Sequence, residues 1–150
     1  MPITNYDKYM PIAGKAGQLA NYQDYSADSY AAAEVIPYGA AVQLTADGEG
    51  ITPLKAGGTP IGIALAQEIH DWVTNADDQK YLVGQPVAVI KRGNIFVTAG
   101  GDVVTGNAVK VEPTTGKFVA TSETAIAFPT AVFKAKATAD SLVQIEINLP

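Results

Sequence analysis

The last residues of the chain constrain its fold more than any other stretch. In residues 142–149, Val143, Ile145, Ile147 and Leu149 stand at every second position, with polar residues between them. Successive side chains of a β-strand point to opposite faces of the sheet, so this alternation predicts a strand with one buried face. Such a strand needs a sheet to join.

Short apolar runs separated by turn residues recur along the chain from Val35 onward. The chain contains 14 glycines and 9 prolines, which favour many turns and little long helix. Runs of this length predict strands, and their number predicts an all-β fold: a compact β-barrel or sandwich of about eight short strands. The runs lie at 40–44, 60–67, 86–91, 94–99, 107–112, 117–122, 130–137 and 142–149.

Two pairs of these runs are predicted to form β-hairpins. Arg92 and Gly93 separate 86–91 from 94–99, and two residues ending in glycine are typical of a tight hairpin turn. The second predicted turn is 113–116, where Gly116 suits a left-handed backbone conformation. The run at 60–67 is apolar at nearly every position, which predicts that both of its faces are covered.

Residues 1–33 show neither a strand nor a helix period, yet they hold five of the seven tyrosines. We expect an extended N-terminal arm over 1–33, followed by a single domain over 34–150. Tyrosine is enriched where one protein buries against another, so we predict that the arm contacts a partner or a neighbouring subunit. Two alternatives are an arm that folds back over its own domain and a disordered tail. The predicted anchors are Tyr6, Tyr9, Tyr22, Tyr25 and Tyr30.

Composition excludes several classes of partner. The net charge is −5 and the basic residues are scattered singly, so we predict no nucleic-acid binding, which needs a basic patch. No apolar run approaches the roughly 18 residues of a membrane helix, so we predict no membrane partner. Residues 1–20 show no signal-peptide pattern. Charged residues make up only 17%, as expected if a partner covers part of the surface.

No residue pattern predicts catalytic chemistry. His70 is the only histidine and the chain has no cysteine, whereas a transition-metal site normally needs more imidazole or thiolate ligands. No serine lies in a nucleophile elbow, and no glycine-rich loop opens a helix in the manner of a phosphate-binding loop. We therefore predict a protein that is not an enzyme and that binds neither a cofactor nor a metal.

Residues 68–80 form the one polar insertion, which we expect to be a loop or one short helix. It contains Trp72, a second candidate for an exposed contact. An alternative function also rests on this region. In that reading, a β-barrel or sandwich module binds carbohydrate or another small ligand on a platform of Trp72, Tyr81, Asp77 and Asp78.

Several stretches resemble, in order, the structural cement (capsid decoration) proteins of tailed bacteriophages. Residues 57–65 are similar to the family's Pro-Ile-Gly-hydrophobic-Ala strand, and 81–99 resemble its Gly-x-Pro-Val strand, Arg-Gly turn and following strand. Each motif consists of residues that are common in β-turns and strands, but together the motifs span nearly the whole chain. The insertion at 68–80 has no match in the family pattern. The remaining similar stretches are 13–20, 33–42 with its Ile-Pro-aromatic-Gly segment, and the closing strand 143–150.

The resemblance implies a non-enzymatic virion protein on the outer surface of the phage head. Its partners would be the major capsid protein and further copies of itself, as a dimer or a trimer. Such a protein bridges neighbouring capsomers and helps the shell to resist the pressure of the packaged DNA.

Overall fold

The structure is a computed structural model that describes residues 15–21, 24–67 and 79–150. Within these ranges it contains strands and no helix, which confirms the all-β prediction. The strands are β1 (Ser26–Ala31), β2 (Ile36–Pro37), β3 (Ala41–Leu44), β4 (Ile51–Pro53), β5 (Gly62–Ala64), β6 (Lys80–Tyr81), β7 (Pro86–Thr98), β8 (Ala108–Val111), β9 (Phe118–Val119), β10 (Ile126–Phe133) and β11 (Leu142–Asn148).

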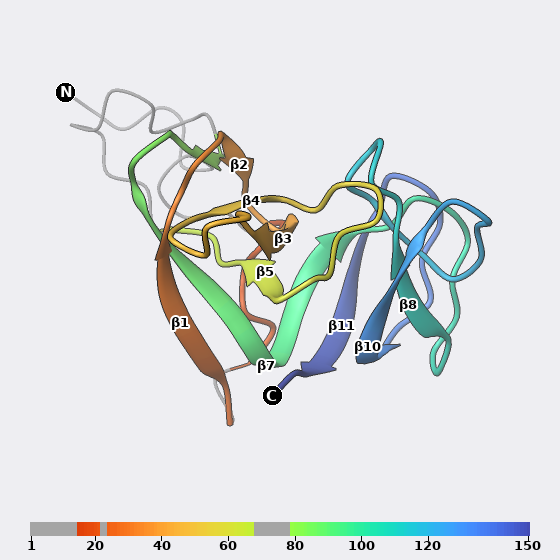
Figure 1. Ribbon diagram of the computed structural model, residues 1–150. Coiled ribbons are helices and arrows are strands. Elements are labelled where there is room, and N and C mark those ends of the chain that lie inside the picture. Colours follow the sequence, from red (N-terminus) through yellow and green to blue (C-terminus); the bar gives the residue numbers. More distant parts are fainter. Residues whose placement is uncertain (1–14, 22–23, 68–78) are drawn as a thin grey trace, which may run out of the picture.

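Nine of the strands form one antiparallel sheet that curls into a half-barrel (Figure 1). Its order is β4-β3-β5-β7-β11-β10-β8-β9, and β1 joins by pairing with β7. The strands β2 and β6 form a separate two-stranded pair. The strand β7 therefore pairs with strands of both halves of the molecule and connects the N-terminal half to the C-terminal half.

The predicted hairpin at Arg92–Gly93 is wrong, because residues 86–98 form the single 13-residue strand β7. Figure 1 shows this strand sharply bent, with β1 alongside its first part and β11 alongside its second. Both parts pair with other strands and not with each other: Val89 and Ile90 lie opposite β5, and Arg92 to Thr98 lie opposite β11. Gly93, at φ 137°, lies where the pairing of β7 changes from β5 to β11. The predicted hairpin would need a type I′ turn, with a left-handed backbone conformation at both Arg92 and Gly93, and β7 continues through these residues instead.

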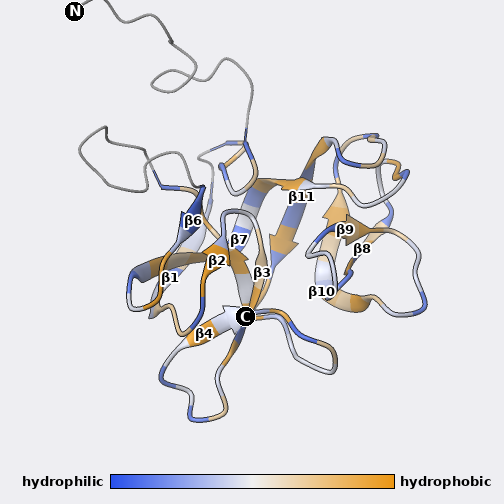
Figure 2. Ribbon diagram, turned by 90° about the horizontal axis from the view of Figure 1, so that it is seen from above, coloured by the Kyte–Doolittle hydropathy of each residue, from blue (hydrophilic) through white to orange (hydrophobic). Residues whose placement is uncertain are grey.

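The buried apolar residues form two clusters. The first gathers residues of β7, β8, β10 and β11, among them the fully buried Ile95, Phe133 and Ile145, and it extends to Ala41 of β3 and Ile63 of β5. The second gathers residues of the N-terminal half, among them Ile36 and Tyr81. Hydrophobic residues colour most of the strands in Figure 2, and much of the hydrophilic colour lies on the peripheral turns.

Other local predictions are confirmed. Val143, Ile145 and Ile147 are buried along β11, as the alternation predicts. The strands β8 and β9 form the predicted hairpin, in which Gly116 has φ 71°. The short strand β5 is buried at all three positions.

The segments β1–β2 and β6–β7 run side by side as one antiparallel ribbon. Ala27 lies opposite Ile90, and Pro37 lies opposite Lys80. The pairing is interrupted at 32–35 and 82–85. Because the interruption is four residues long in both segments, the register is the same on either side of it.

Candidate interaction surface

The five predicted tyrosine anchors divide into two groups. Tyr25 and Tyr30 belong to the described residues, whereas Tyr6, Tyr9 and Tyr22 lie outside them, as do Trp72 and the rest of residues 68–78. Tyr25 is 46% exposed and lies against Gly93 at the bend of β7. Tyr30 is half-buried and packs against the second apolar cluster. Of the described pair, Tyr25 exposes the larger fraction of its side chain.

Residues 15–21 lie along the second part of β7. The amide of Gly17 donates to the carbonyl of Phe96 at 2.8 Å, and the amide of Phe96 donates to the carbonyl of Gln18 at 2.9 Å. Leu19 forms an antiparallel bridge with Ile95. The described part of the predicted arm therefore folds back over its own sheet, one of the arrangements that the sequence leaves open.

An aromatic and cationic contact fixes the start of this segment. The Nζ atom of Lys15 lies 5.6 Å from the ring centroid of Tyr38 and donates to the carbonyl of Gln67 at 3.2 Å. The Tyr38 ring meets the Tyr81 ring edge-on, with centroids 5.2 Å apart. Burial raises the pKa of the Tyr38 hydroxyl. These contacts hold Lys15 to the domain from two sides.

Tyr81 is fully buried, so it offers no ring surface to a ligand. Its hydroxyl donates to the carbonyl of Leu65, and burial raises its pKa to about 12. The prediction that Tyr81 forms part of a carbohydrate-binding platform is therefore wrong. A buried tyrosine whose hydroxyl is satisfied by a backbone carbonyl is a structural feature of the core.

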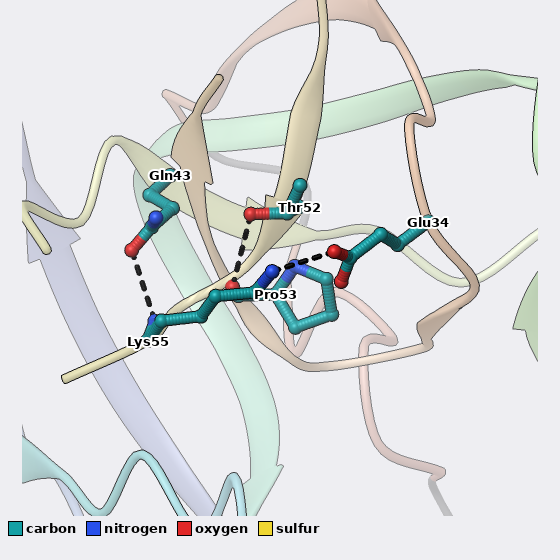
Figure 3. A network of polar contacts seen from close by, with 5 residues as sticks. All are labelled: Glu34, Gln43, Thr52, Pro53 and Lys55. Atoms are coloured by element: carbon teal, nitrogen blue, oxygen red, sulfur yellow. Dashed lines mark hydrogen bonds and ion pairs between the residues drawn. The ribbon is translucent and has the colours of Figure 1, made fainter. Parts of the chain in front are cut away.

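A small polar network fixes the loop between β4 and β5 (Figure 3). The Oε1 atom of Gln43 accepts a hydrogen bond from the amide of Lys55 at 2.9 Å, and the ammonium group of Lys55 lies 2.5 Å from Glu34. Gly58 completes the fit, because a methyl group there would come within 1.8 Å of the Gln43 oxygen. This network joins the segment before β2 to the β3–β5 region.

An exposed apolar surface lies at the interruption of the β1–β2 and β6–β7 ribbon. We call it the valine turn; it consists of Val35, Leu82 and Val83, which are 44%, 36% and 64% exposed. The turn is held in place, because Gly84 has φ 85° and its amide donates to the carbonyl of Ala32 at 2.8 Å. The amide of Leu82 also donates to the Gln85 side chain at 2.8 Å. A fixed turn presents its side chains to a partner at little cost in conformational entropy.

The valine turn is not predicted from the sequence. The signal that could have indicated it is Val83–Gly84, a pair suited to the centre of a type II turn. Such a turn places the first of the two side chains outward.

The strand β1 is exposed along most of its length. Five of its six residues are exposed, and Tyr30 is the exception. Two ion pairs tie this segment to β7: Asp28 lies 2.5 Å from Lys91, and Asp24 lies 2.7 Å from Arg92. The contact with Asp28 raises the pKa of Lys91. The surface around β1 is therefore polar and locally balanced in charge.

The described residues show little that resembles a reactive centre. Among them, no group of three or more histidine, cysteine, aspartate or glutamate side chains is placed to hold a metal ion. Nor does any helix in this part of the chain have the length and apolar character needed to cross a membrane. Ser122 donates to the carboxylate of Glu112 at 2.9 Å, and Ser141 lies 3.1 Å from the hydroxyl of Thr138.

Comparison with known proteins identifies the family and the fold of the chain. The family model described as structural cement protein (E217 gp24/Pam3 gp6) matches residues 1–148. No curated protein sequence matches the chain. The fold is similar to that of a chain in the solved structure "The capsid of Myoviridae Phage XM1", with a TM-score of 0.68, 20% identity and 89% of each chain covered.

A second solved structure shares the fold less closely. It is "The crystal structure of head fiber gp8.5 N base in bacteriophage phi29", with a TM-score of 0.55 and 15% identity. The match covers 83% of this chain and 94% of the other. At these identities the two likenesses concern the fold alone.

Proposed function

Because the chain belongs to the phage structural cement protein family, we propose that it binds the outer surface of an assembled phage head, bridges neighbouring capsomers and stabilises the shell. The observation that carries this proposal is the family match over residues 1–148. We further propose that it acts without catalysis, as a dimer or a trimer, and that its main partner is the major capsid protein.

The physical basis of this stabilisation is preferential binding to one state. A subunit that contacts two capsomers at once binds the assembled shell more tightly than the separated capsomers, so it shifts the equilibrium toward assembly. Each contact can be modest, because linked contacts raise one another's effective concentration. An acidic chain with a net charge of −5 suits the outside of a shell better than the DNA-lined inside.

Two surfaces are proposed to supply the contacts. The first is the tyrosine-rich N-terminal arm, with Tyr6, Tyr9, Tyr22, Tyr25 and Tyr30 as its anchors and Trp72 as a further candidate. The second is the valine turn, whose fixed backbone and exposed aliphatic side chains suit a shallow apolar pocket. Tyrosine is enriched at interfaces, and covering exposed aliphatic side chains removes apolar area from water.

The test is co-sedimentation with undecorated heads of the same phage. One variant lacks residues 1–14, which leaves Lys15, Gly17 and the pairing of β1 with β7 in place. We expect the full chain to bind heads to saturation, and the shortened chain to bind at least tenfold more weakly while giving the same circular dichroism spectrum.

The valine turn has its own variant and control. Val83→Ser is expected to weaken binding to heads, whereas Val104→Ser, at a 50% exposed valine elsewhere, is expected to leave it unchanged. If the full chain does not bind mature heads, the proposed function is wrong. If it binds and both valine variants bind equally well, only the assignment of the valine turn is wrong.

A further inference from the structure

We infer that the outer edge of β1 is a site for strand addition, and that its occupant is a basic, extended segment of the capsid shell. This inference rests on the proposed function, because it names the way in which the head is bound. The edge consists of the backbone groups of Ala27 and Ser29 that face away from β7.

The direction of these groups follows from the pairing of β7 on its other side. The carbonyl of Ala88 accepts a hydrogen bond from the amide of Leu65 at 2.8 Å, so Ala88 directs its backbone groups toward β5. Ser29 lies opposite Ala88 in the β1–β7 pair. In an antiparallel pair, residues opposite each other either exchange both hydrogen bonds or none. The backbone groups of Ser29 must therefore face outward.

The same reasoning applies two residues earlier. Ala27 lies opposite Ile90, and a methyl group on Gly62 of β5 would come within 2.5 Å of the Ile90 carbonyl oxygen. That oxygen thus faces β5, and Ala27 faces outward like Ser29. Within the described chain, β1 pairs with β7 alone, so this edge offers two amides and two carbonyls to a new strand.

The ends of the edge are defined. On one side, the register shifts between Ser26 and Ala27. On the other side, Ala32 forms a parallel bridge with Ile51, and the carbonyl of Ala31 lies next to Gly50. The available edge therefore runs from Ala27 to Ser29 and suits a short strand that makes about four hydrogen bonds.

The edge of β1 lacks the two most direct forms of protection, which are a lysine or proline on the strand and a covering element among the described residues. Natural edges commonly carry lysine or proline, or are covered by another element. The sequence of β1 is Ser-Ala-Asp-Ser-Tyr-Ala, with neither lysine nor proline, and its side chains other than Tyr30 are short and exposed. A partner strand can therefore approach both the backbone and the two faces.

The charge of Asp28 favours a basic partner strand over a second copy of this chain at the edge of β1. In a symmetric antiparallel pairing of two copies, with Ala27 opposite Ser29 of the other copy, the two Asp28 side chains would lie directly opposite each other. Like charges in that position are destabilising. A shifted pairing would bring the second copy against Ala31, where β4 already lies. A lysine or arginine opposite Asp28 is favourable, because the chain has a net charge of −5 and the Asp28 side chain remains 49% exposed in its ion pair with Lys91.

The decisive experiment is residue-resolved hydrogen exchange on the full chain, alone and bound to undecorated heads. In the free protein we expect the amides of Ala27 and Ser29 to exchange freely and those of Asp28 and Tyr30 to be protected. On heads, we expect exchange at Ala27 and Ser29 to slow at least tenfold. Unchanged exchange at both amides in head-bound protein overturns the inference and leaves the proposed function intact.

Two other results would overturn the inferred occupant or the proposed function. If protection appears when the protein alone is concentrated, a second copy covers the edge and the inferred occupant is wrong. If the chain does not bind heads, the proposed function and this inference fail together.

Variants test the backbone and the charge separately. Ser29→Pro removes an outward amide that β7 does not use, so we expect the domain to fold and to bind heads at least tenfold more weakly. Ser29→Ala keeps the amide and is expected to bind normally. If Ser29→Pro detaches β1, the exchange measurement on the unaltered chain still decides. Asp28→Asn should weaken binding severalfold, whereas Asp24→Asn, before the edge, should not.

Discussion

Gly17 and Gly39 lie backbone to backbone. A methyl group on Gly17 would come within 2.6 Å of the Gly39 nitrogen, and one on Gly39 would come within 2.7 Å of the Gly17 nitrogen. Both residues have positive φ, at 84° and 79°. Their amides bond to different strands, since Gly17 donates to Phe96 of β7 and Gly39 donates to Ala64 of β5. This contact docks the segment 15–21 on the domain.

We predict that Gly39→Ala destabilises the protein more than Gly48→Ala. Gly48 also has positive φ, at 74°, but nothing lies near its would-be methyl group. Strain in the left-handed region alone costs about 1–2 kcal/mol, the cost expected for Gly48→Ala. Overpacking adds about 1–3 kcal/mol at Gly39. Urea unfolding measures both. Equal losses of unfolding free energy would show that the two glycines are not in tight contact.

A second prediction concerns the buried hydroxyl of Tyr81. Tyr81→Phe leaves the carbonyl of Leu65 without its partner, which costs about 1–3 kcal/mol of unfolding free energy. Tyr38→Phe is the control, because the Tyr38 hydroxyl makes only a long, exposed contact of 3.4 Å with Gln67. Its effect should be smaller, as measured by urea unfolding. A larger loss in Tyr38→Phe would contradict this ranking.

The same residue predicts a change in stability at alkaline pH. The pKa of Tyr81 is about 12 in the folded protein, against an ordinary value of 10.0. Because the folded pKa is the higher one, this contribution to stability is complete below pH 10 and is lost as pH rises from 10 toward 12. Unfolding midpoints measured across this range should fall less steeply in Tyr81→Phe. An identical slope in both proteins would exclude Tyr81 as the cause.

The network in Figure 3 allows a direct comparison of a hydrogen bond with an ion pair. Gln43→Ala removes the acceptor of the Lys55 amide and should cost about 1 kcal/mol. Glu34→Gln removes an ion pair whose side chains are 47% and 55% exposed, so it should cost less than about 0.5 kcal/mol and lose its effect in high salt. Thermal unfolding at two salt concentrations distinguishes the two. A salt-sensitive loss in Gln43→Ala would contradict this assignment.

The parts of the fold that the sequence predicts are those that local patterns decide. The strand β11 follows from a period of two, and the β8–β9 hairpin follows from the backbone preference of Gly116. The bend of β7 could not be predicted in this way. Arg92–Gly93 is chemically suited to a hairpin, but β11 pairs with the second part of β7, and β1 and β5 pair with the first part. This competition among distant segments is invisible in a local window.

The candidate interaction surface likewise has features that the local sequence predicts and features that depend on distant segments. The richness of residues 1–33 in tyrosine is a property of composition, so the sequence alone indicates a binding segment there. The different surroundings of Tyr25 and Tyr30 depend on how β1 lies on β7. The exposure of Val83 depends on the matched interruption of two chain segments that are about 50 residues apart, and the outward edge of β1 depends on β5. Each requires the tertiary pairing.

The final prediction concerns the carboxylate of Glu112, which collects hydroxyl donors from one loop. Thr124 donates to it at 2.8 Å and Ser122 donates at 2.9 Å, and these hydrogen bonds lower the pKa of Glu112. The folded pKa is below the ordinary value, so this contribution is present at neutral pH and is lost as pH falls through the folded pKa. The loop at 112–124 should therefore loosen in acid before the core unfolds.

A carbon-detected NMR titration of the Glu112 carboxylate tests this directly. The double variant Ser122→Ala, Thr124→Ala should raise the midpoint toward the ordinary glutamate value, because the charged form loses its two closest donors. Thr115→Ala is the matched control: its hydroxyl accepts a hydrogen bond from the Lys117 amide and is not a donor to Glu112. If the midpoint of Glu112 does not move in the double variant, the hydroxyl groups are not what stabilises its charge. If it moves in the control as well, the whole turn, and not the two donors, sets the pKa.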